Sequence, residues 1–82
     1  MNETRVESTT LRAFAYDDGR EVLQLEFVSG AIYHYYGVPA AVHEGLLGAP
    51  SKGRYFNRVI RVRFHYILIL HASAQTDLAG KG

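Results

Sequence analysis

The sequence predicts a small α+β domain: a three-stranded antiparallel β-meander followed by two helices. Three stretches between residues 11 and 37 alternate apolar and polar side chains or are rich in aromatic residues, and short turn sequences separate them. The next two stretches, 38–48 and 51–61, place apolar residues at helical spacing. With 82 residues, of which 48% are hydrophobic, the chain has the composition of one globular domain.

The first two predicted strands are 11–16 and 21–28, joined by a turn at 17–20. This turn reads Asp-Asp-Gly-Arg, in which aspartates accept local backbone hydrogen bonds and glycine tolerates a positive φ. In the first strand, alternation predicts Leu11 on the same face as the two alanines that follow, and Arg12 on the opposite face. In the second strand, the three apolar residues from Leu23 to Phe27 share one face.

The third predicted strand, 31–37, is rich in aromatic residues, and its register depends on the turn before it. A two-residue loop, 29–30, would place Tyr33 and Tyr35 on the polar face of the second strand. A three-residue loop, 28–30, with Gly30 in the left-handed conformation, would place them beside the apolar residues. We favour the second register, which leaves His34 near Glu26 on the polar face.

Two helices are predicted after the strands. The first begins at Val38-Pro39, because proline suits the first helical position, and Gly48 ends it. The second begins after Ser51, a favourable N-cap residue. Its apolar face consists of two adjacent pairs, 55–56 and 59–60, and a second stripe consists of Arg54, Arg58 and Arg61.

The two ends of the chain are expected to lie outside a domain that spans residues 11–70. Residues 1–10 are polar and are predicted to form a flexible N-terminus, and residues 71–82 a flexible C-terminal tail. The apolar run 62–70 could prolong the second helix or form a last strand. The absence of cysteine excludes disulfides and favours a reducing compartment, so we expect a cytoplasmic protein. No apolar run is long enough to span a membrane.

The charges are distributed unevenly along the chain. Residues 1–50 hold three arginines and seven acidic residues, a balance of −4, whereas residues 51–82 hold six basic residues and one acidic residue, a balance of +5. Clustered arginines repel one another, so either a bound anion or carboxylates from the first half should neutralise them. Arginine forks onto phosphate and tyrosine stacks on unpaired bases, which together indicate nucleic acid, RNA more than DNA. The candidate residues are Lys52, Arg54, Tyr55, Arg58, Arg61 and Arg63. In the less favoured register of the third strand, with the two-residue loop, Tyr33 and Tyr35 are possible stacking residues as well.

Self-association is the alternative function that the sequence leaves open. The C-terminal apolar run exceeds what a thin domain needs to cover, and a large exposed apolar patch marks an interface. The candidate interface residues are Phe64, Tyr66, Ile67 and Ile69. Catalysis is not expected, because the four histidines lie on different predicted elements and no nucleophile is paired with a base. We therefore predict neither a metal site nor a cofactor.

Several motifs in the middle of the chain carry a resemblance to a known family. They are Phe-x-Ser-Gly-x-x-Tyr-x-Tyr-x-Gly-Val-Pro at 27–39, the Leu-Leu pair at 46–47, Ser-Lys-Gly-Arg-Tyr-Phe-Asn at 51–57 and Ile-Arg at 60–61. In this order and spacing they resemble the KTSC domain, a small bacterial domain that also occurs at the C-terminus of some lysyl-tRNA synthetases. Because of the synthetase connection, the resemblance strengthens the expectation of RNA as a partner. Together with the residue patterns above, it leads us to expect a non-catalytic binding module. The chain departs from the pattern at Phe64-His65-Tyr66, where similar proteins tend to carry a proline between the aromatic residues.

Overall fold

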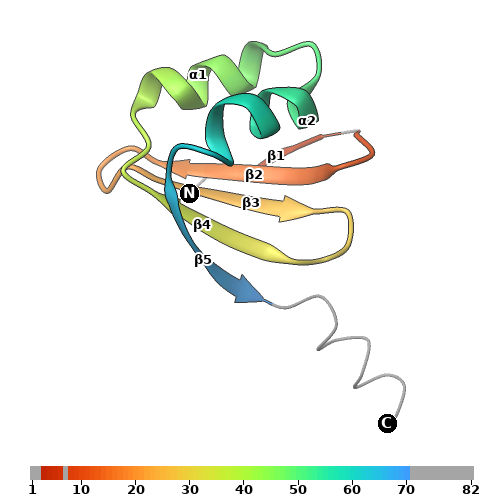
Figure 1. Ribbon diagram of the computed structural model, residues 1–82, viewed down its shortest axis with the longest axis horizontal. Helices are drawn as coiled ribbons and strands as arrows, with labels where there is room; N and C mark the ends of the chain where they lie inside the picture. Colours follow the sequence, from red (N-terminus) through yellow and green to blue (C-terminus); the bar gives the residue numbers. More distant parts are fainter. Residues whose placement is uncertain (1–2, 7, 71–82) are drawn as a thin grey trace, which may run out of the picture.

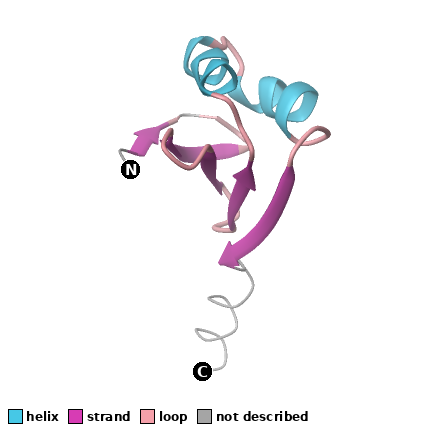
Figure 2. Cartoon of the chain, turned by 90° about the vertical axis from the view of Figure 1, so that its left-hand side faces the viewer, coloured by secondary structure: helices cyan, strands magenta, loops and turns pink. Residues whose placement is uncertain are grey.

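The protein is a two-layer α+β domain in which the helices cover one face of an antiparallel sheet (Figures 1 and 2). The computed structural model describes residues 3–6 and 8–70, so the predicted tail at 71–82 lies outside the described residues. The strands follow one another in the sheet in the order β1-β2-β3-β4-β5. The elements are β1 (Glu3–Arg5), β2 (Leu11–Asp17), β3 (Val22–Phe27), β4 (Ile32–Tyr36), α1 (Ala40–Gly48), α2 (Lys52–Tyr55), η1 (Phe56–Ile60) and β5 (His65–Leu70).

The α+β class is confirmed, but the sheet has five strands and not the three that the sequence predicted. The first additional strand, β1, lies within the stretch 1–10 that was expected to be flexible, and its Thr4 pairs with Phe14 of β2. The second, β5, resolves the helix-or-strand alternative for the C-terminal run. Tyr66 of β5 lies opposite Tyr35 of β4. Both additional strands are edge strands, held to the sheet by backbone pairing on one side.

The three-residue loop between β3 and β4 is confirmed. Phe27 and Ala31 close the loop: the Phe27 N–H donates to the Ala31 carbonyl (2.9 Å), and the Gly30 N–H donates to the Phe27 carbonyl (2.8 Å). Gly30 has a φ of +100°, which strongly favours glycine. Tyr33 consequently pairs with Leu25, so its ring joins the apolar face as the favoured register requires.

The polar face differs from the prediction in one detail. His34 lies opposite Gln24 and its Nε2 is 2.7 Å from the Gln24 Oε1, so its partner is not the expected Glu26. Glu26 instead forms an ion pair with Arg12, at 3.6 Å. The favoured register itself gives this pairing, because Glu26 lies opposite Ile32, two residues along the strand from His34.

A β-bulge at Arg12 changes which residues of β2 face the helices. Leu11 pairs with Phe27, but Ala13 pairs with Glu26, so Arg12 is an extra residue in β2. Leu11 therefore shares the helix-facing side with Phe14, contrary to the alternation predicted from the sequence. The Arg12 guanidinium donates to the Val28 carbonyl (3.0 Å).

The hydrophobic core lies between the sheet and the helices. In α1, Leu46 is completely buried, whereas Leu47 is 45% exposed. Pro39 is the N-cap of α1 and not its first helical residue, so the helix begins one position later than predicted. His43 of α1 stacks on Tyr16 with ring centroids 4.6 Å apart. The buried core residues are Leu11, Phe14, Leu23, Leu25, Tyr35, Val38, Leu46, Phe56 and Ile60.

Candidate nucleic-acid interface

The basic segment forms a short helix, as the sequence predicted. Ser51 caps it: its hydroxyl accepts a hydrogen bond from the Arg54 N–H at 3.3 Å. The first turn is α-helical over α2, and the rest, η1, is a π-helical turn. Phe56 and Ile60 are buried against the core, so the predicted apolar face is confirmed.

The π turn splits the arginine stripe that regular helical spacing predicted. The Arg61 N–H donates to the Phe56 carbonyl at 2.9 Å, five residues back rather than four. A π turn brings residues five apart onto the same side, so Arg61 lies beside Phe56. Arg54 and Arg58 instead line a separate hollow of about 220 Å³ next to Pro50. The three arginines therefore do not form one continuous stripe.

Two of the predicted nucleic-acid-binding residues have structural contacts. The Lys52 ammonium donates to two carbonyls at the end of α1, those of Leu47 (3.1 Å) and Ala49 (2.7 Å). Cations are favourable there because the carbonyls at a helix C-terminus lack helical partners. The Tyr55 hydroxyl donates to the Val42 carbonyl (3.1 Å), which joins the second helix to the first. Both side chains connect the two helices.

The arginines of the segment have no carboxylate partner among the described residues. The ion pairs among the described residues all lie in the first half of the chain, and they join Arg5 to Glu3, Arg12 to Glu26 and Arg20 to Asp17. Within the described ranges, no carboxylate lies within 4.0 Å of the exposed arginines that follow Ser51, and Arg61 contacts the side-chain oxygen of Asn57 at 3.5 Å. These exposed arginines are Arg54, Arg58, Arg61 and Arg63. Neutralisation by acidic residues of the first half is thus not seen in the described structure.

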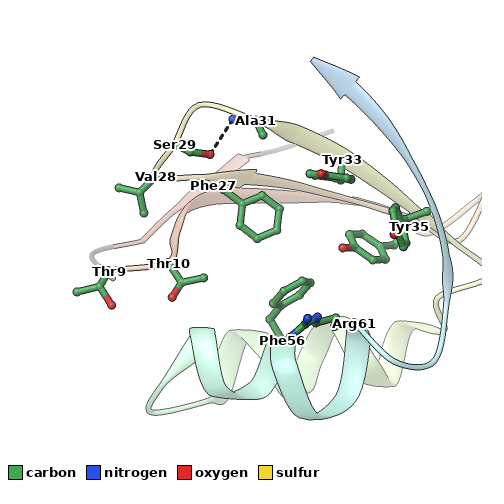
Figure 3. A pocket seen from close by; sticks show the side chains of 11 residues that line it. Thr9, Thr10, Phe27, Val28, Ser29, Ala31, Tyr33, Tyr35, Phe56 and Arg61 are labelled. Carbon is green, nitrogen blue, oxygen red and sulfur yellow. Dashed lines mark hydrogen bonds between the residues drawn. The ribbon is translucent and has the colours of Figure 1, made fainter. Parts of the chain in front are cut away.

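Beside this segment lies an aromatic pocket of about 590 Å³. In Figure 3, Phe27, Tyr33 and Tyr35 project from the sheet toward Phe56 and Arg61, which come from the helical side. Tyr66 of β5 also lines the pocket. We define the aromatic pocket by these six residues.

Tyr35 is the most buried aromatic residue of the pocket, with 3% of its surface exposed. Its ring lies 5.8 Å from Phe56 and 5.4 Å from Tyr66, measured between centroids. Burial, with the neighbouring hydroxyls of Tyr33 and Tyr66, raises the pKa of Tyr35 to about 12, and the nearby Arg61 opposes this shift. The hydroxyl is therefore protonated at neutral pH and can donate a hydrogen bond.

Sequence reasoning identified parts of this pocket but did not bring them together. Tyr33 and Tyr35 were considered for stacking only in the register that the structure does not adopt, whereas they line a pocket in the favoured one. Phe27 and Phe56 were assigned to the core alone. The sequence does contain one indication of the pocket, namely the number of aromatic residues on one predicted face. A pocket could not be inferred from it, because Tyr66 belongs to β5, whose position in the sheet was not predicted.

The four predicted interface residues differ in exposure. Tyr66, Ile67 and Ile69 lie on β5 and are 56%, 55% and 49% exposed. Phe64 precedes β5 and packs against the core, so it contributes less to an exposed surface than predicted.

Comparison with known proteins identifies the family. The sequence profile of the KTSC domain matches residues 7–64. The fold superimposes on the crystal structure of a KTSC domain protein from Yersinia pestis with a TM-score of 0.81 and 32% identity, covering 84% of this chain and 97% of that one. The chain belongs to the KTSC domain family, as its motifs indicated.

The relatives include both small proteins and segments of a large enzyme. An uncharacterized protein of Stutzerimonas stutzeri is 42% identical over 66 residues, which cover 80% of this chain and 92% of that protein. A lysine–tRNA ligase of Nostoc sp. is 45% identical over 60 residues, 73% of this chain but 11% of the ligase. The domain therefore also occurs as a minor part of a much longer protein.

The described residues contain neither a group of metal-ligating side chains nor a membrane-spanning helix. Among them, no three His, Asp or Glu side chains gather in a group that could hold a metal ion. In the same part of the chain, no helix is long and apolar enough to cross a membrane.

Proposed function

We propose that this protein is a non-catalytic binding module for nucleic acid, RNA more than DNA, and that its basic helix contacts the phosphates. The observation that carries the proposal is the set of four exposed arginines from Arg54 to Arg63, which have no described carboxylate within 4.0 Å. Arginine presents its donors in a fork that matches phosphate oxygens. Because clustered cations repel one another, a polyanion along this surface lowers their electrostatic energy.

The family relationship supports RNA as the polyanion. The homologous segment of the Nostoc protein belongs to an enzyme whose name identifies tRNA as its substrate. A small basic surface attached to such an enzyme, or acting alone, would add phosphate contacts without chemistry of its own. The proposal places the protein in the cytoplasm, where RNA is abundant, and requires no cofactor.

The number of contacts limits the expected affinity. Lys52 and Tyr55 are engaged with α1, so the available phosphate contacts are the four arginines. Each contact with a single strand contributes a slope of about −0.7 to the dependence of log affinity on log salt. Four contacts predict a slope of roughly −3, and weak binding at physiological salt.

A salt titration with matched charge variants tests the proposal. We expect Arg54→Ala, Arg58→Ala to weaken binding of labelled single-stranded RNA and to reduce the slope by about 1.4, which is two contacts. The control, Arg5→Ala, Arg20→Ala, removes the same charge from exposed residues elsewhere and should leave the slope unchanged. Equal effects of the two double variants, or no binding at low salt, would refute the proposal.

The exposure of β5 favours a second candidate function, self-association as a homodimer. This strand presents five large apolar side chains, 39–56% exposed, and carries no Lys, Arg, Asp or Glu. Its outer edge leaves backbone N–H and C=O groups without partners in the described sheet, and edge strands of this kind pair with another chain. Two copies of β5 in antiparallel register would satisfy these groups and bring the apolar side chains of the two strands into contact.

The test of self-association is the solution mass. We expect a dimer at tens of micromolar, and Ile67→Asp, Ile69→Asp should convert it to a monomer because each carboxylate would be buried unpaired. The control is Val62→Asp, at a position that is 73% exposed but lies outside β5. A monomeric wild type, or a double variant that remains dimeric, would exclude the β5 interface.

A further inference from the structure

The aromatic pocket has a lining suited to a flat ring. Its five aromatic side chains contact one another mainly edge to face: Phe27 meets Phe56 at 69°, and Tyr33 meets Tyr66 at 68°. In such contacts the edge of one ring touches the face of the next, so the rings do not form a closed stack. Tyr66 is 56% exposed, which leaves part of its surface available to a ligand. A planar aromatic ligand can therefore stack on the exposed part of Tyr66.

The Tyr35 hydroxyl adds a polar group to the lining of the pocket. The side chain is 97% buried and lines the pocket, yet its hydroxyl has no hydrogen-bond partner among the described residues. By contrast, the hydroxyls of Tyr16 and Tyr55 each donate to a backbone carbonyl. A buried hydroxyl without a partner is unfavourable, so a ligand that accepts its hydrogen bond would gain affinity.

The charge of the pocket restricts the ligand further. Arg61 is the single charged residue in its described lining, and no carboxylate accompanies it. An aromatic pocket could otherwise attract an organic cation, but Arg61 would repel one. Hydroxyl groups in the lining, including that of Tyr35, disfavour a purely aliphatic ligand. The remaining class is a flat aromatic group that bears a negative charge beside it.

A nucleotide satisfies these conditions. Ligand pockets typically measure about 300–1,000 Å³, and the aromatic pocket, at about 590 Å³, falls within this range. Nucleobases have oxygen and nitrogen acceptors on their edges and stack on aromatic side chains in single-stranded RNA. Arg61 can contact the attached phosphate, and it follows Arg58 of the basic segment by three residues.

We propose that the aromatic pocket binds one unstacked nucleobase, with Tyr66 stacked on the base, the Tyr35 hydroxyl donating to its edge and Arg61 contacting its phosphate. This inference rests on the proposed function in that the base belongs to a bound RNA strand. The same chemistry is present in a free nucleotide, and the experiment separates the two sources.

The experiment compares three probes: an eight-residue oligouridylate, an abasic ribose-phosphate oligomer of the same length, and uridine monophosphate. Binding is followed by isothermal titration calorimetry at two salt concentrations. We expect the oligouridylate to bind about tenfold or more tightly than the abasic oligomer. Tyr66→Ala should reduce oligouridylate affinity about 5- to 160-fold, the range found for base–aromatic stacking, and should leave the abasic oligomer unaffected. Tyr36→Ala is the control, because Tyr36 lies on the same sheet but on the opposite face.

A second pair of variants separates ligand contact from structural damage. Tyr35→Phe removes a hydroxyl without a described partner, so the melting temperature should not fall while oligouridylate affinity does. Tyr16→Phe removes a hydroxyl that donates to the Val38 carbonyl at 2.6 Å, so the melting temperature should fall while affinity is retained. A loss of stability in Tyr35→Phe with unchanged affinity would overturn the role of this hydroxyl.

The outcomes distinguish the two proposals. If both oligomers bind equally and with the same salt dependence, the phosphate-binding function stands and the base-binding pocket is wrong. If uridine monophosphate binds, is weakened by Tyr66→Ala, and neither oligomer binds, the pocket is a nucleotide site and the RNA-binding function is wrong. If no probe binds at low salt, both proposals fail.

Discussion

Replacing Gly45 by alanine sets two opposing effects of known size against each other. Alanine in a helix is favoured over glycine by about 1 kcal/mol, so Gly45→Ala would stabilise α1 in isolation. In the folded protein, however, a Cβ at this position would collide with the Tyr55 hydroxyl and ring. The ring must move away, which breaks its 3.1 Å hydrogen bond to the Val42 carbonyl. That bond contributes about 1 kcal/mol, and reduced burial of the ring costs roughly another 1–1.5 kcal/mol.

The net expectation for Gly45→Ala is a loss of about 1 kcal/mol in the free energy of unfolding, seen in urea denaturation followed by circular dichroism. In a domain of this size the melting temperature should fall by about 4–8 °C. Gly48→Ala is the matched control, since a Cβ there meets nothing within 4 Å, and it should be neutral or slightly stabilising. Adding Tyr55→Phe to Gly45→Ala should restore part of the loss, because the hydroxyl is the closest atom. A Gly45→Ala protein as stable as Gly48→Ala would refute the packing of α1 against Tyr55.

Three further predictions concern the hairpin and the contact between β2 and α1. Gly30→Ala should reduce the free energy of unfolding by about 1–2 kcal/mol, because a φ of +100° strains any residue with a side chain. Thermal denaturation measures the loss, with Gly19→Ala as the control, because a Cβ at Gly19 makes only an ordinary van der Waals contact. Tyr16→Phe should cost about 1 kcal/mol, measured in the same assay, by leaving the Val38 carbonyl unpaired. Burial lowers the pKa of His43 below its ordinary value of 6.5, with Glu44 opposing, so the unfolded chain binds the proton more readily. The contribution of His43 to the free energy of unfolding is therefore complete above pH 6.5 and falls as the pH drops below it. Urea denaturation at several pH values measures this fall. It should be smaller in His43→Phe, which keeps a ring against Tyr16.

The central part of the fold could be predicted from the sequence because local rules determine it. The three strands β2 to β4, the Gly30 loop and the capped helix after Ser51 each follow from alternation, turn chemistry or a cap. The two edge strands could not be predicted in this way. Residues 3–5 read Glu-Thr-Arg, which has no apolar face, and β5 is apolar without alternation because its side chains are exposed on both faces. Their positions depend on pairing with β2 and β4, which is a tertiary effect.

The candidate site was predicted less completely, for reasons of backbone geometry. The arginine spacing assumed 3.6 residues per turn, but the hydrogen bond from Arg61 to Phe56 spans five residues and moves Arg61 to the aromatic pocket. Similarly, the extra residue Arg12 in β2 shifts Leu11 to the core side. A π turn and a β-bulge each insert one residue into a regular pattern, and the sequence has no local signal for either.

The two outer strands of the sheet differ in a way that would limit the stoichiometry of any assembly built by strand addition. At one side, β1 is three residues long and carries Glu3 and Arg5. At the other side, β5 is six residues long and contains no Asp, Glu, Lys or Arg. A molecule with two adhesive sides could add further copies indefinitely and grow into a fibre. With one adhesive side, pairing of β5 with a second β5 would use up the growth point of both molecules. The assembly would then stop at two copies, with a short charged strand at each end.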